Sequence, residues 1–141
     1  MGVLKLKLTI AYDGFQYKGW QVQKSGITVQ QKIEEALQKL FPSVDRVHSS
    51  SRTDTGVHAR GMVAHVEIEK DEYRIGELKL RLALNAFLPD DVSVLEVKRV
   101  PANFHARFDA TGKQYRYMIW NHPVSNPLTR HTSWHVSRNL D

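Results

Sequence analysis

Apolar residues repeat with two different periods along this chain, and the order of the two patterns constrains the fold most. A period of two is typical of strands with one buried face, and a period of about 3.6 is typical of amphipathic helices. Residues 4–10 and 62–69 alternate, whereas residues 29–40 and 75–87 carry apolar residues at helical spacing. Thr28 is predicted to cap the first helix, with Gln31 completing a capping box.

Further segments complete the pattern. Residues 44–50 and 92–100 are strand-like, and residues 107–109 and 114–120 are predicted to form two strands joined by a turn at residues 111–112. The resulting order is β-α-β-β-α-β-β-β. It predicts the α+β class, with a ferredoxin-like split βαβ layer: a mostly antiparallel sheet with two helices on one face. The other face is expected to be open for an RNA or a second sheet.

Composition narrows the class of protein. The 141 residues are 41% hydrophobic and 25% charged, which is typical of a packed globular protein. No apolar run approaches the roughly 20 residues that cross a bilayer, and the alternating N-terminus does not resemble a signal peptide. The absence of cysteine excludes disulfides and Cys-based zinc sites. We therefore expect a cytoplasmic protein without membrane contact.

The positive charge is concentrated in one part of the chain. Residues 1–97 are neutral overall, so the net charge of +5 comes from residues 98–141, which also hold many of the aromatic rings. Cations suit phosphates and flat rings suit bases, so this composition favours a nucleic-acid surface. The alternative is a solvated basic face beside an aromatic core.

Residues 51–59, Ser-Arg-Thr-Asp-Thr-Gly-Val-His-Ala, form the most unusual stretch. Asp54 lies in a hydroxyl-rich segment, with Arg52 two residues before it and Gly56 two residues after it. Gly56 permits a tight turn and the close approach of a ligand. Arg52 can keep Asp54 ionised, orient it or bind a phosphate. The purely structural alternative is an Asx-turn, in which the Asp54 carboxylate accepts hydrogen bonds from nearby backbone amides.

Three kinds of chemistry fit an aspartate in this setting. Asp54-Thr55-Gly56 matches the Asp-Thr-Gly of aspartic proteases, but there the triplet follows an apolar strand in an all-β fold. Asp54, His58 and His65 are candidate metal ligands, although no His pair at metal-ligand spacing supports them and we expect no metal. The third possibility is a lone carboxylate that acts on a nucleotide in a basic, aromatic protein.

Several other segments make the third possibility specific. In order along the chain they are residues 11–14, 19–21 with Gln23, 28–30, 51–59, Asn85 with 88–89, 104–107 and 113–117. Together they resemble the TruA family of tRNA pseudouridine synthases over nearly the whole chain, and the sequence Arg-Thr-Asp-X-Gly-Val-His is close to diagnostic for that family.

The resemblance implies a reaction and its residues. Family members isomerise uridine to pseudouridine in the tRNA anticodon stem-loop, around positions 38 to 40, without a cofactor or a metal, and they act as homodimers. Asp54 matches the catalytic aspartate, Tyr115 the ring that stacks on the target uracil, and Arg52 the arginine that holds the flipped nucleotide. His105 and Arg107 are candidates for supporting the Asp54 loop.

This chain departs from the family pattern in two ways. Ser51 replaces the commoner glycine before Arg-Thr-Asp, and family members normally continue for about a hundred residues more. We therefore expect residues 1–141 to be the N-terminal portion of the catalytic domain, without the C-terminal half of the family fold and inactive alone. The alternative function is a non-catalytic RNA-binding module.

Overall fold

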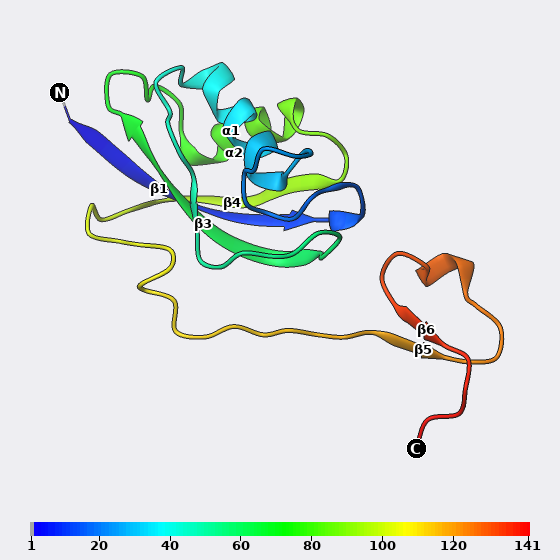
Figure 1. The fold of residues 1–141 in the computed structure, drawn as a ribbon. Coiled ribbons are helices and arrows are strands. Elements are labelled where there is room, and N and C mark those ends of the chain that lie inside the picture. The colour runs from blue at the N-terminus through cyan, green and yellow to red at the C-terminus, as the bar shows by residue number, and fades with distance from the viewer. Residues whose placement is uncertain (1) are drawn as a thin grey trace. The chain divides into compact units, whose positions relative to one another are not determined.

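A computed structural model describes residues 2–141, which divide along the chain into two compact units, with the boundary between Ala110 and Thr111. The first unit contains a four-stranded sheet and two α-helices (Figure 1). Its elements are β1 (Val3–Tyr12), a short 3-10 helix (Gly14–Gln16), α1 (Val29–Leu40), β2 (His48–Ser49), β3 (Ala59–Glu69), α2 (Glu77–Phe87) and β4 (Val92–Val100).

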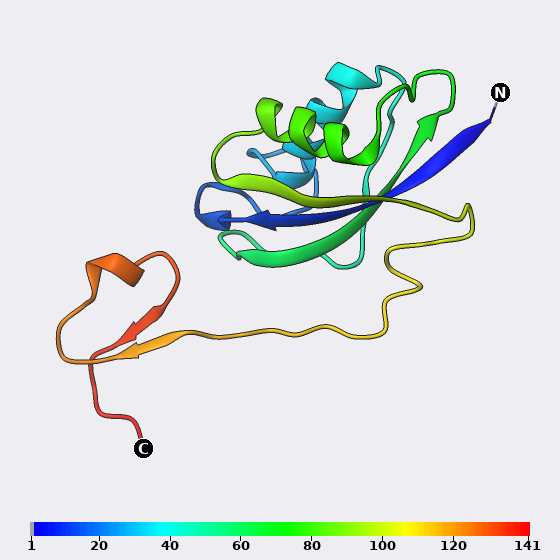
Figure 2. The same cartoon turned by 180° about the vertical axis from the view of Figure 1, so that it is seen from behind.

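The strands of the first unit lie in the order β2-β3-β1-β4, and every neighbouring pair is antiparallel. Because β3 lies between β1 and β2, the connection through α1 is a split βαβ unit, as the sequence predicts. Both helices cover the same face of the sheet, as the front and back views agree (Figures 1 and 2). The predicted α+β class is therefore confirmed.

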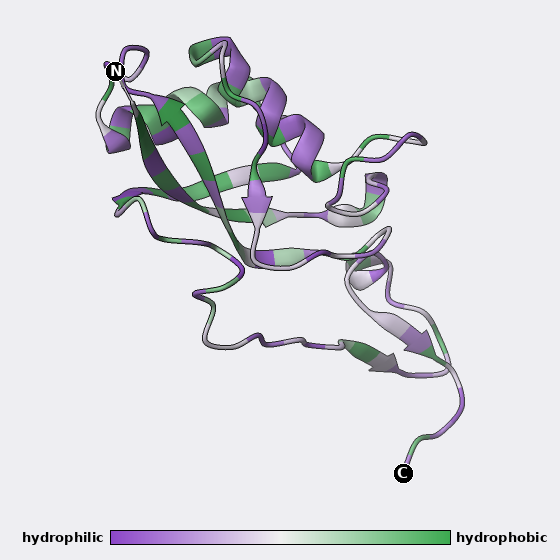
Figure 3. Cartoon of the chain, turned by 60° about the vertical axis from the view of Figure 1, so that its left-hand side comes forward, coloured by the Kyte–Doolittle hydropathy of each residue, from purple (hydrophilic) through white to green (hydrophobic). Residues whose placement is uncertain are grey.

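The period of two in β1 explains how the core forms. Leu6, Leu8 and Ile10 are fully buried beneath the helices, whereas Lys5 and Lys7 point to the other face of the sheet. Figure 3 shows the resulting alternation of hydrophobic and hydrophilic residues along the strands. Burial of such side chains stabilises the fold by about 1.5–3 kcal/mol each, so this core makes the sheet a firm base for its loops.

Helix α1 begins and ends as the sequence predicts. The Thr28 hydroxyl accepts a hydrogen bond from the Gln31 amide at 3.3 Å, which satisfies one of the amides at the helix start. Helix α2 begins at Glu77, two residues later than predicted. The Asn85 side chain holds α2 to β4 through hydrogen bonds with both the amide and the carbonyl of Val94.

The strand predicted over residues 44–50 is shorter than expected, because β2 comprises His48 and Ser49 alone. Side chains of α1 bond the backbone groups that a longer strand would use. Gln38 donates to the Val44 carbonyl at 3.1 Å, and Glu34 accepts from the Val47 amide at 3.0 Å. A strand pattern is thus replaced by an irregular segment packed beneath the helix.

The strands predicted over residues 107–109 and 114–120 are wrong, apart from the last two residues of the second. Residues 105–109 instead form a closed turn on the outer face of the sheet, so that face is partly covered and not fully open. Residues 111–118 contain no strand. An extended segment becomes a strand when a neighbour supplies a ladder of hydrogen bonds, and within residues 111–118 the structure shows one backbone bond alone, from the Trp134 amide to the Met118 carbonyl at 2.7 Å.

The second unit is small. It contains β5 (Ile119–Asn121), a 3-10 helix (Pro127–Thr129) and β6 (Trp134–Val136), and β5 pairs with β6 in parallel. Many of its large apolar side chains are exposed, including Tyr117, Leu128 and Trp134. Within residues 2–141, neither unit contains a helix with the length and hydrophobicity of a membrane span.

Candidate active-site loop

The loop over residues 50–58 joins β2 to β3 and carries Asp54. The Val57 amide donates to the Asp54 carbonyl at 3.1 Å, which closes a four-residue turn. Gly56, the third residue of this turn, has a φ of +80°. That backbone conformation strongly favours glycine, so the spacing of Asp54 and Gly56 reflects the geometry of the turn.

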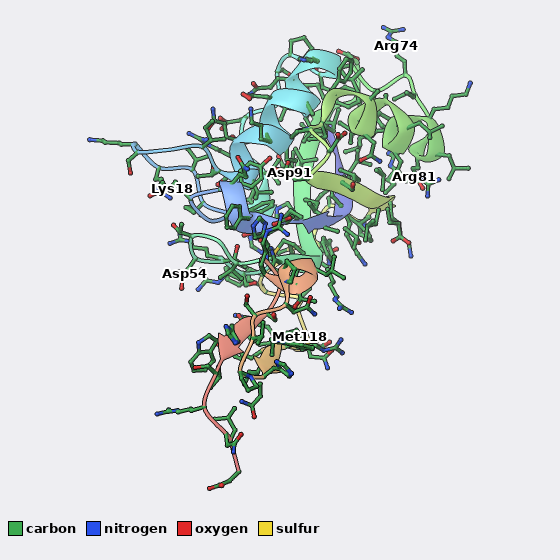
Figure 4. All side chains as sticks on the ribbon, turned by 90° about the vertical axis from the view of Figure 1, so that its right-hand side faces the viewer. Lys18, Asp54, Arg74, Arg81, Asp91 and Met118 are labelled. Atoms are coloured by element: carbon green, nitrogen blue, oxygen red, sulfur yellow. The ribbon has the colours of Figure 1, made fainter. Side chains whose placement is uncertain are left out.

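The Asp54 carboxylate is exposed and makes no hydrogen bond or ion pair with any residue in the described range 2–141. Figure 4 shows Asp54 at the outer edge of the first unit. The Asx-turn alternative is therefore wrong, because the turn is closed by backbone groups alone. Arg52 is also exposed, and it forms no ion pair with Asp54. The loop presents an acid whose oxygens are available to a ligand.

A second segment, residues 12–20, forms hydrogen bonds with this loop. The Tyr12 hydroxyl and Thr53 Oγ1 are 2.7 Å apart and share a hydrogen bond. The Trp20 amide donates to the Thr53 carbonyl at 3.1 Å, and the Gly56 amide donates to the Tyr17 carbonyl at 3.2 Å. These contacts bond the residues on both sides of Asp54 without using its carboxylate.

Two glycines allow this close contact. A Cβ atom at Gly14 would lie 1.9 Å from the Val57 carbonyl oxygen, and one at Gly19 would lie 2.5 Å from the Thr53 carbonyl oxygen. Gly19 also has a φ of +84°. Both distances are shorter than any tolerable contact. Glycine is therefore required at positions 14 and 19, where the Tyr-Asp-Gly and Gly-Trp-Gln segments lie against the loop.

Three aromatic residues of this second segment, Tyr12, Tyr17 and Trp20, belong to the core, whereas Phe15 is 54% exposed. Trp20 is 1% exposed and its ring centroid lies 6.1 Å from that of Tyr12. Burial raises the pKa of Tyr12, and the hydrogen bond to Thr53 opposes this effect. Burial also raises the pKa of Tyr17, whose hydroxyl donates to Asp91 at 2.5 Å. Both phenols therefore stay protonated; that of Tyr12 contacts the loop through Thr53, and that of Tyr17 bonds Asp91 outside the loop.

The two histidines considered as metal ligands have other contacts. His58 Nδ1 accepts a hydrogen bond from the Gly14 amide at 2.9 Å and lies 3.2 Å from the Asp13 carboxylate. His65 Nδ1 accepts from the Ala106 amide at 2.9 Å. Residues 2–141 contain no group of three or more His, Asp or Glu side chains placed to hold a metal ion.

His105 and Arg107, the predicted supports of the loop, make their contacts elsewhere. His105 Nδ1 accepts from the backbone amides of Arg107 and Phe108, at 3.1 and 3.3 Å. The Arg107 guanidinium lies 6.0 Å from the centre of the Phe108 ring. Within the described residues neither side chain forms a hydrogen bond or ion pair with Asp54, so they stabilise their own turn.

Tyr115, the predicted stacking residue, lies in the second unit. Tyr115 is 62% exposed, so its ring is accessible to a base. It belongs to the segment 111–118, which has no regular secondary structure. The structure thus describes Asp54 with Arg52 on one loop, and Tyr115 separately.

Two buried polar residues of α1, Glu34 and Gln30, were not among the predicted site residues, although Gln30 lies in the segment 28–30 that resembles the family. Glu34 is 7% exposed and accepts from Gln30 and from the Val47 amide, and it forms an ion pair with Arg46 at 3.0 Å. Gln30 in turn accepts from the Val22 amide at 2.9 Å. The available signal was a Gln and a Glu four residues apart on the face of α1 that also holds apolar residues.

Comparison with known proteins agrees with this geometry. A family model described as tRNA pseudouridine synthase matches residues 8–109. The tRNA pseudouridine synthase A of Geotalea daltonii is 47% identical over 134 residues, which are 93% of this chain and 52% of that protein. The protein of the same name from Solidesulfovibrio magneticus is 48% identical over 137 residues, 95% of this chain and 49% of its own length.

The match extends across the β-α-β-β-α-β unit and includes the loop of Asp54. The chain therefore belongs to the tRNA pseudouridine synthase family. It spans about half the length of the curated relatives that it matches.

Proposed function

We propose that this protein isomerises uridine to pseudouridine in tRNA, with Asp54 as the catalytic carboxylate. The observation that carries the proposal is the availability of the Asp54 side chain. The loop is held by backbone bonds and by Thr53, while the carboxylate itself has no partner among the described residues. Such a group is positioned before the substrate arrives and loses no internal bond on binding it.

The isomerisation requires one carboxylate from the protein. The N1–C1′ bond breaks, the uracil turns, and a C1′–C5 bond forms; C5 loses its proton and N1 regains one. Positive charge develops at C1′ during cleavage, as in glycoside hydrolysis. A carboxylate such as Asp54 can attack that centre, stabilise its charge or take a proton from the sugar. A second carboxylate is not required, because no water attacks.

The uridine must leave the stacked RNA before it can react. We propose that Arg52 holds the displaced nucleotide through its phosphate and that Tyr115 stacks on the uracil. Stacking of a base on an aromatic ring contributes roughly 1–3 kcal/mol. His105 and Arg107 are proposed to act at a distance, by fixing the turn that precedes Tyr115.

The remaining features follow from the family resemblance and the length comparison. We propose that residues 1–141 form the N-terminal portion of the catalytic domain and that the chain alone is inactive. The complete enzyme is proposed to be a cytoplasmic homodimer that modifies the anticodon stem-loop around positions 38 to 40 without a cofactor. The exposed apolar side chains of the second unit support this view, because they leave surface for further protein or RNA to cover.

A chimera tests the proposed reaction. Residues 1–141 replace the matching portion of the Geotalea daltonii protein, and tRNA labelled with tritium at uracil C5 is the substrate. Release of tritium reports the loss of the C5 proton, and mapping of the product reports the position. The expected result is turnover by the chimera and none by residues 1–141 alone.

The alternative function, a non-catalytic RNA-binding module, has a different outcome in the same experiment. Both the chimera and residues 1–141 would then bind tRNA, and neither would release tritium, while the unmodified Geotalea protein remains active as the positive control. That result would contradict the proposed enzyme activity.

A further inference from the structure

Residues 104–109 form a compact turn on the face of the sheet opposite the helices; we refer to it as the 104–109 turn. The Asp109 amide donates to the His105 carbonyl at 2.9 Å, and the Asp109 carboxylate accepts from the His105 amide at 2.7 Å. The turn is therefore closed by its own residues. What attaches it to the sheet is a separate set of contacts.

His65, on β3, supplies the contact at the centre of the turn. The Ala106 amide donates to its Nδ1 at 2.9 Å, and both residues are buried, with 3% and 2% of their surface exposed. The His105 ring meets the His65 ring edge-on, with centroids 4.7 Å apart, and Phe104 packs against it in the same way at 6.2 Å. A histidine on the solvent face of a strand is thus buried by this turn.

Lys5, on β1, attaches the start of the turn. Its ammonium donates to the Ala102 carbonyl at 2.9 Å and to the Phe104 carbonyl at 2.7 Å. These two bonds and the one at Ala106 are polar contacts that join residues 101–109 to the strands of the sheet. Because the Ala106 amide is buried, the loss of its acceptor would leave a polar group without a partner.

We propose that His65 is a positioning residue: its neutral ring holds the 104–109 turn against the sheet and thereby fixes the point from which the chain runs on to Tyr115. The consequence for Tyr115 rests on the proposed function. The attachment itself does not, because it concerns contacts within the first unit alone.

Chain lengths show why this attachment matters. Five residues separate Ala110 from Tyr115, and fifteen separate the end of β4 at Val100 from Tyr115. An extended chain reaches about 3.4 Å per residue, so release of the turn lengthens the reach from roughly 17 Å to roughly 50 Å. The local concentration of a tethered group falls with about the 3/2 power of length, which makes it roughly fivefold lower.

The attachment depends on the protonation state of His65. Nδ1 accepts the Ala106 bond, and a protonated ring has no acceptor nitrogen. Burial lowers the pKa of His65 to about 4, and the positive charge of Lys5 acts in the same direction, with smaller contributions from His105 and His48. The neutral ring is therefore the state that the folded protein favours at neutral pH.

The groups that face His65 from the neighbouring elements are mainly basic. Lys5 and Lys7 come from β1, where Lys7 is its cross-strand partner, and His48 comes from β2 as its partner on the other side. Two carboxylates are also close: Glu67, two residues away on β3 and paired in register with Lys5, and Asp109, which closes the 104–109 turn. Protonation of His65 adds a positive charge to this group, which opposes it electrostatically.

Hydrogen exchange at the Ala106 amide tests the proposal on the 141-residue chain. The protection factor is measured from pH 7.5 to pH 3.5, with the Leu6 and Val66 amides as reporters of the intact sheet. We expect Ala106 to lose protection near pH 4 while the sheet reporters keep theirs. In the same samples, the NMR shifts of the His65 ring and the Ala106 amide should have a common midpoint.

Two variants separate the acceptor from the ring. His65→Phe keeps a ring without an acceptor, and we expect Ala106 protection at pH 7 to fall roughly fivefold to tenfold. His65→Asn keeps a neutral acceptor and should restore protection and remove its pH dependence. His48→Asn, the matched control, removes a neighbouring ring and should leave the Ala106 bond in place.

Separate midpoints for His65 and Ala106 would overturn the proposal, and this comparison requires no variant. Unchanged Ala106 protection in His65→Phe, with the sheet reporters protected, would overturn it as well. Because no reaction is assayed, either result is distinct from a failure of the proposed enzyme activity.

Discussion

The first unit of this chain has a buried apolar core, whereas most large apolar side chains of the second unit are exposed. In the first unit, Leu6, Leu8 and Ile10 are fully buried, whereas in the second unit Leu128 is 91% exposed and Tyr117 is 86% exposed. The first unit can fix a loop on a packed sheet. The second unit presents rings and cations to its surroundings, as a surface for RNA or for further protein would.

The largest expected effect contrasts one leucine from each unit. Leu8→Ala removes a fully buried side chain from β1 and should lower the free energy of unfolding by about 2–5 kcal/mol. Leu128→Ala removes an exposed side chain and should change it by less than about 0.5 kcal/mol. Urea unfolding measures both. Equal effects would remove the distinction between the units.

Alanine substitution of one glycine in each unit compares how closely other atoms pack against the backbone there. Gly14→Ala places a Cβ against the Val57 carbonyl and should destabilise the first unit by at least about 1–3 kcal/mol, with a shift of the Asp54 loop. Gly112→Ala, the control in the second unit, meets nothing within 4 Å. It should have little effect or be slightly stabilising. Thermal unfolding and amide shifts of residues 53–57 report both changes.

The pH dependence of stability should come in part from a histidine of the first unit. His65 has a lowered pKa of about 4 in the folded state, below its ordinary value of 6.5, so the unfolded chain binds more protons between these pH values. Its contribution to stability is complete above pH 6.5 and is lost as the pH falls to about 4. The slope from this group is at most about 1.4 kcal/mol per pH unit.

Denaturant unfolding of wild type and His65→Asn from pH 7.5 to 4 isolates this contribution as a difference between two curves. His122→Asn, in the second unit, is the control, and its curve should run parallel to wild type. If the His65→Asn curve also runs parallel to wild type, His65 does not carry the effect.

The smallest expected effect concerns the basic part of the chain. Binding of tRNA by residues 1–141 should weaken as salt rises, and Arg116→Glu should make the slope of log K against log salt shallower by about one or two. Arg74→Glu makes the same charge change in the first unit and should leave the slope unaltered. A shift of the slope by Arg74→Glu and not by Arg116→Glu would place the RNA surface elsewhere.

Local patterns predicted the parts of the fold that local interactions determine. The start of α1 at Val29 follows from the Thr28 hydroxyl, and the turn at Asp54 follows from the conformation that Gly56 permits. The strands over residues 3–12 and 59–69 largely alternate because one face of the sheet is buried, whereas burial along residues 92–100 is interrupted beside a register shift. These features depend on neighbours along the chain.

Other features depend on contacts between distant residues. The strand pattern of residues 44–50 fails because Glu34 and Gln38 bond its backbone, and neither interaction is visible in a periodicity. The pattern of residues 114–120 fails because a strand requires a partner. His65 has the spacing of a solvent-facing residue on β3, and its burial depends on the 104–109 turn, forty residues later.

The candidate site also combines features that local sequence determines with features that depend on distant residues. The turn that carries Asp54 could be predicted because glycine spacing and hydroxyl residues mark it, whereas the catalytic role of Asp54 stays a prediction. The contacts of His105 and Arg107 could not, because each depends on where a turn without regular secondary structure lies against the sheet. The role of Tyr115 stays a prediction.

The central claim is that the Asp54 carboxylate performs the chemistry and does not hold the fold. Asp54→Asn and the matched surface control Asp45→Asn are introduced into the chimera, and tritium release under single-turnover conditions is measured together with tRNA binding. The account predicts that Asp54→Asn abolishes release while the Kd for tRNA and the unfolding midpoint stay close to wild type, and that Asp45→Asn changes none of the three. Near-normal release by Asp54→Asn would contradict it.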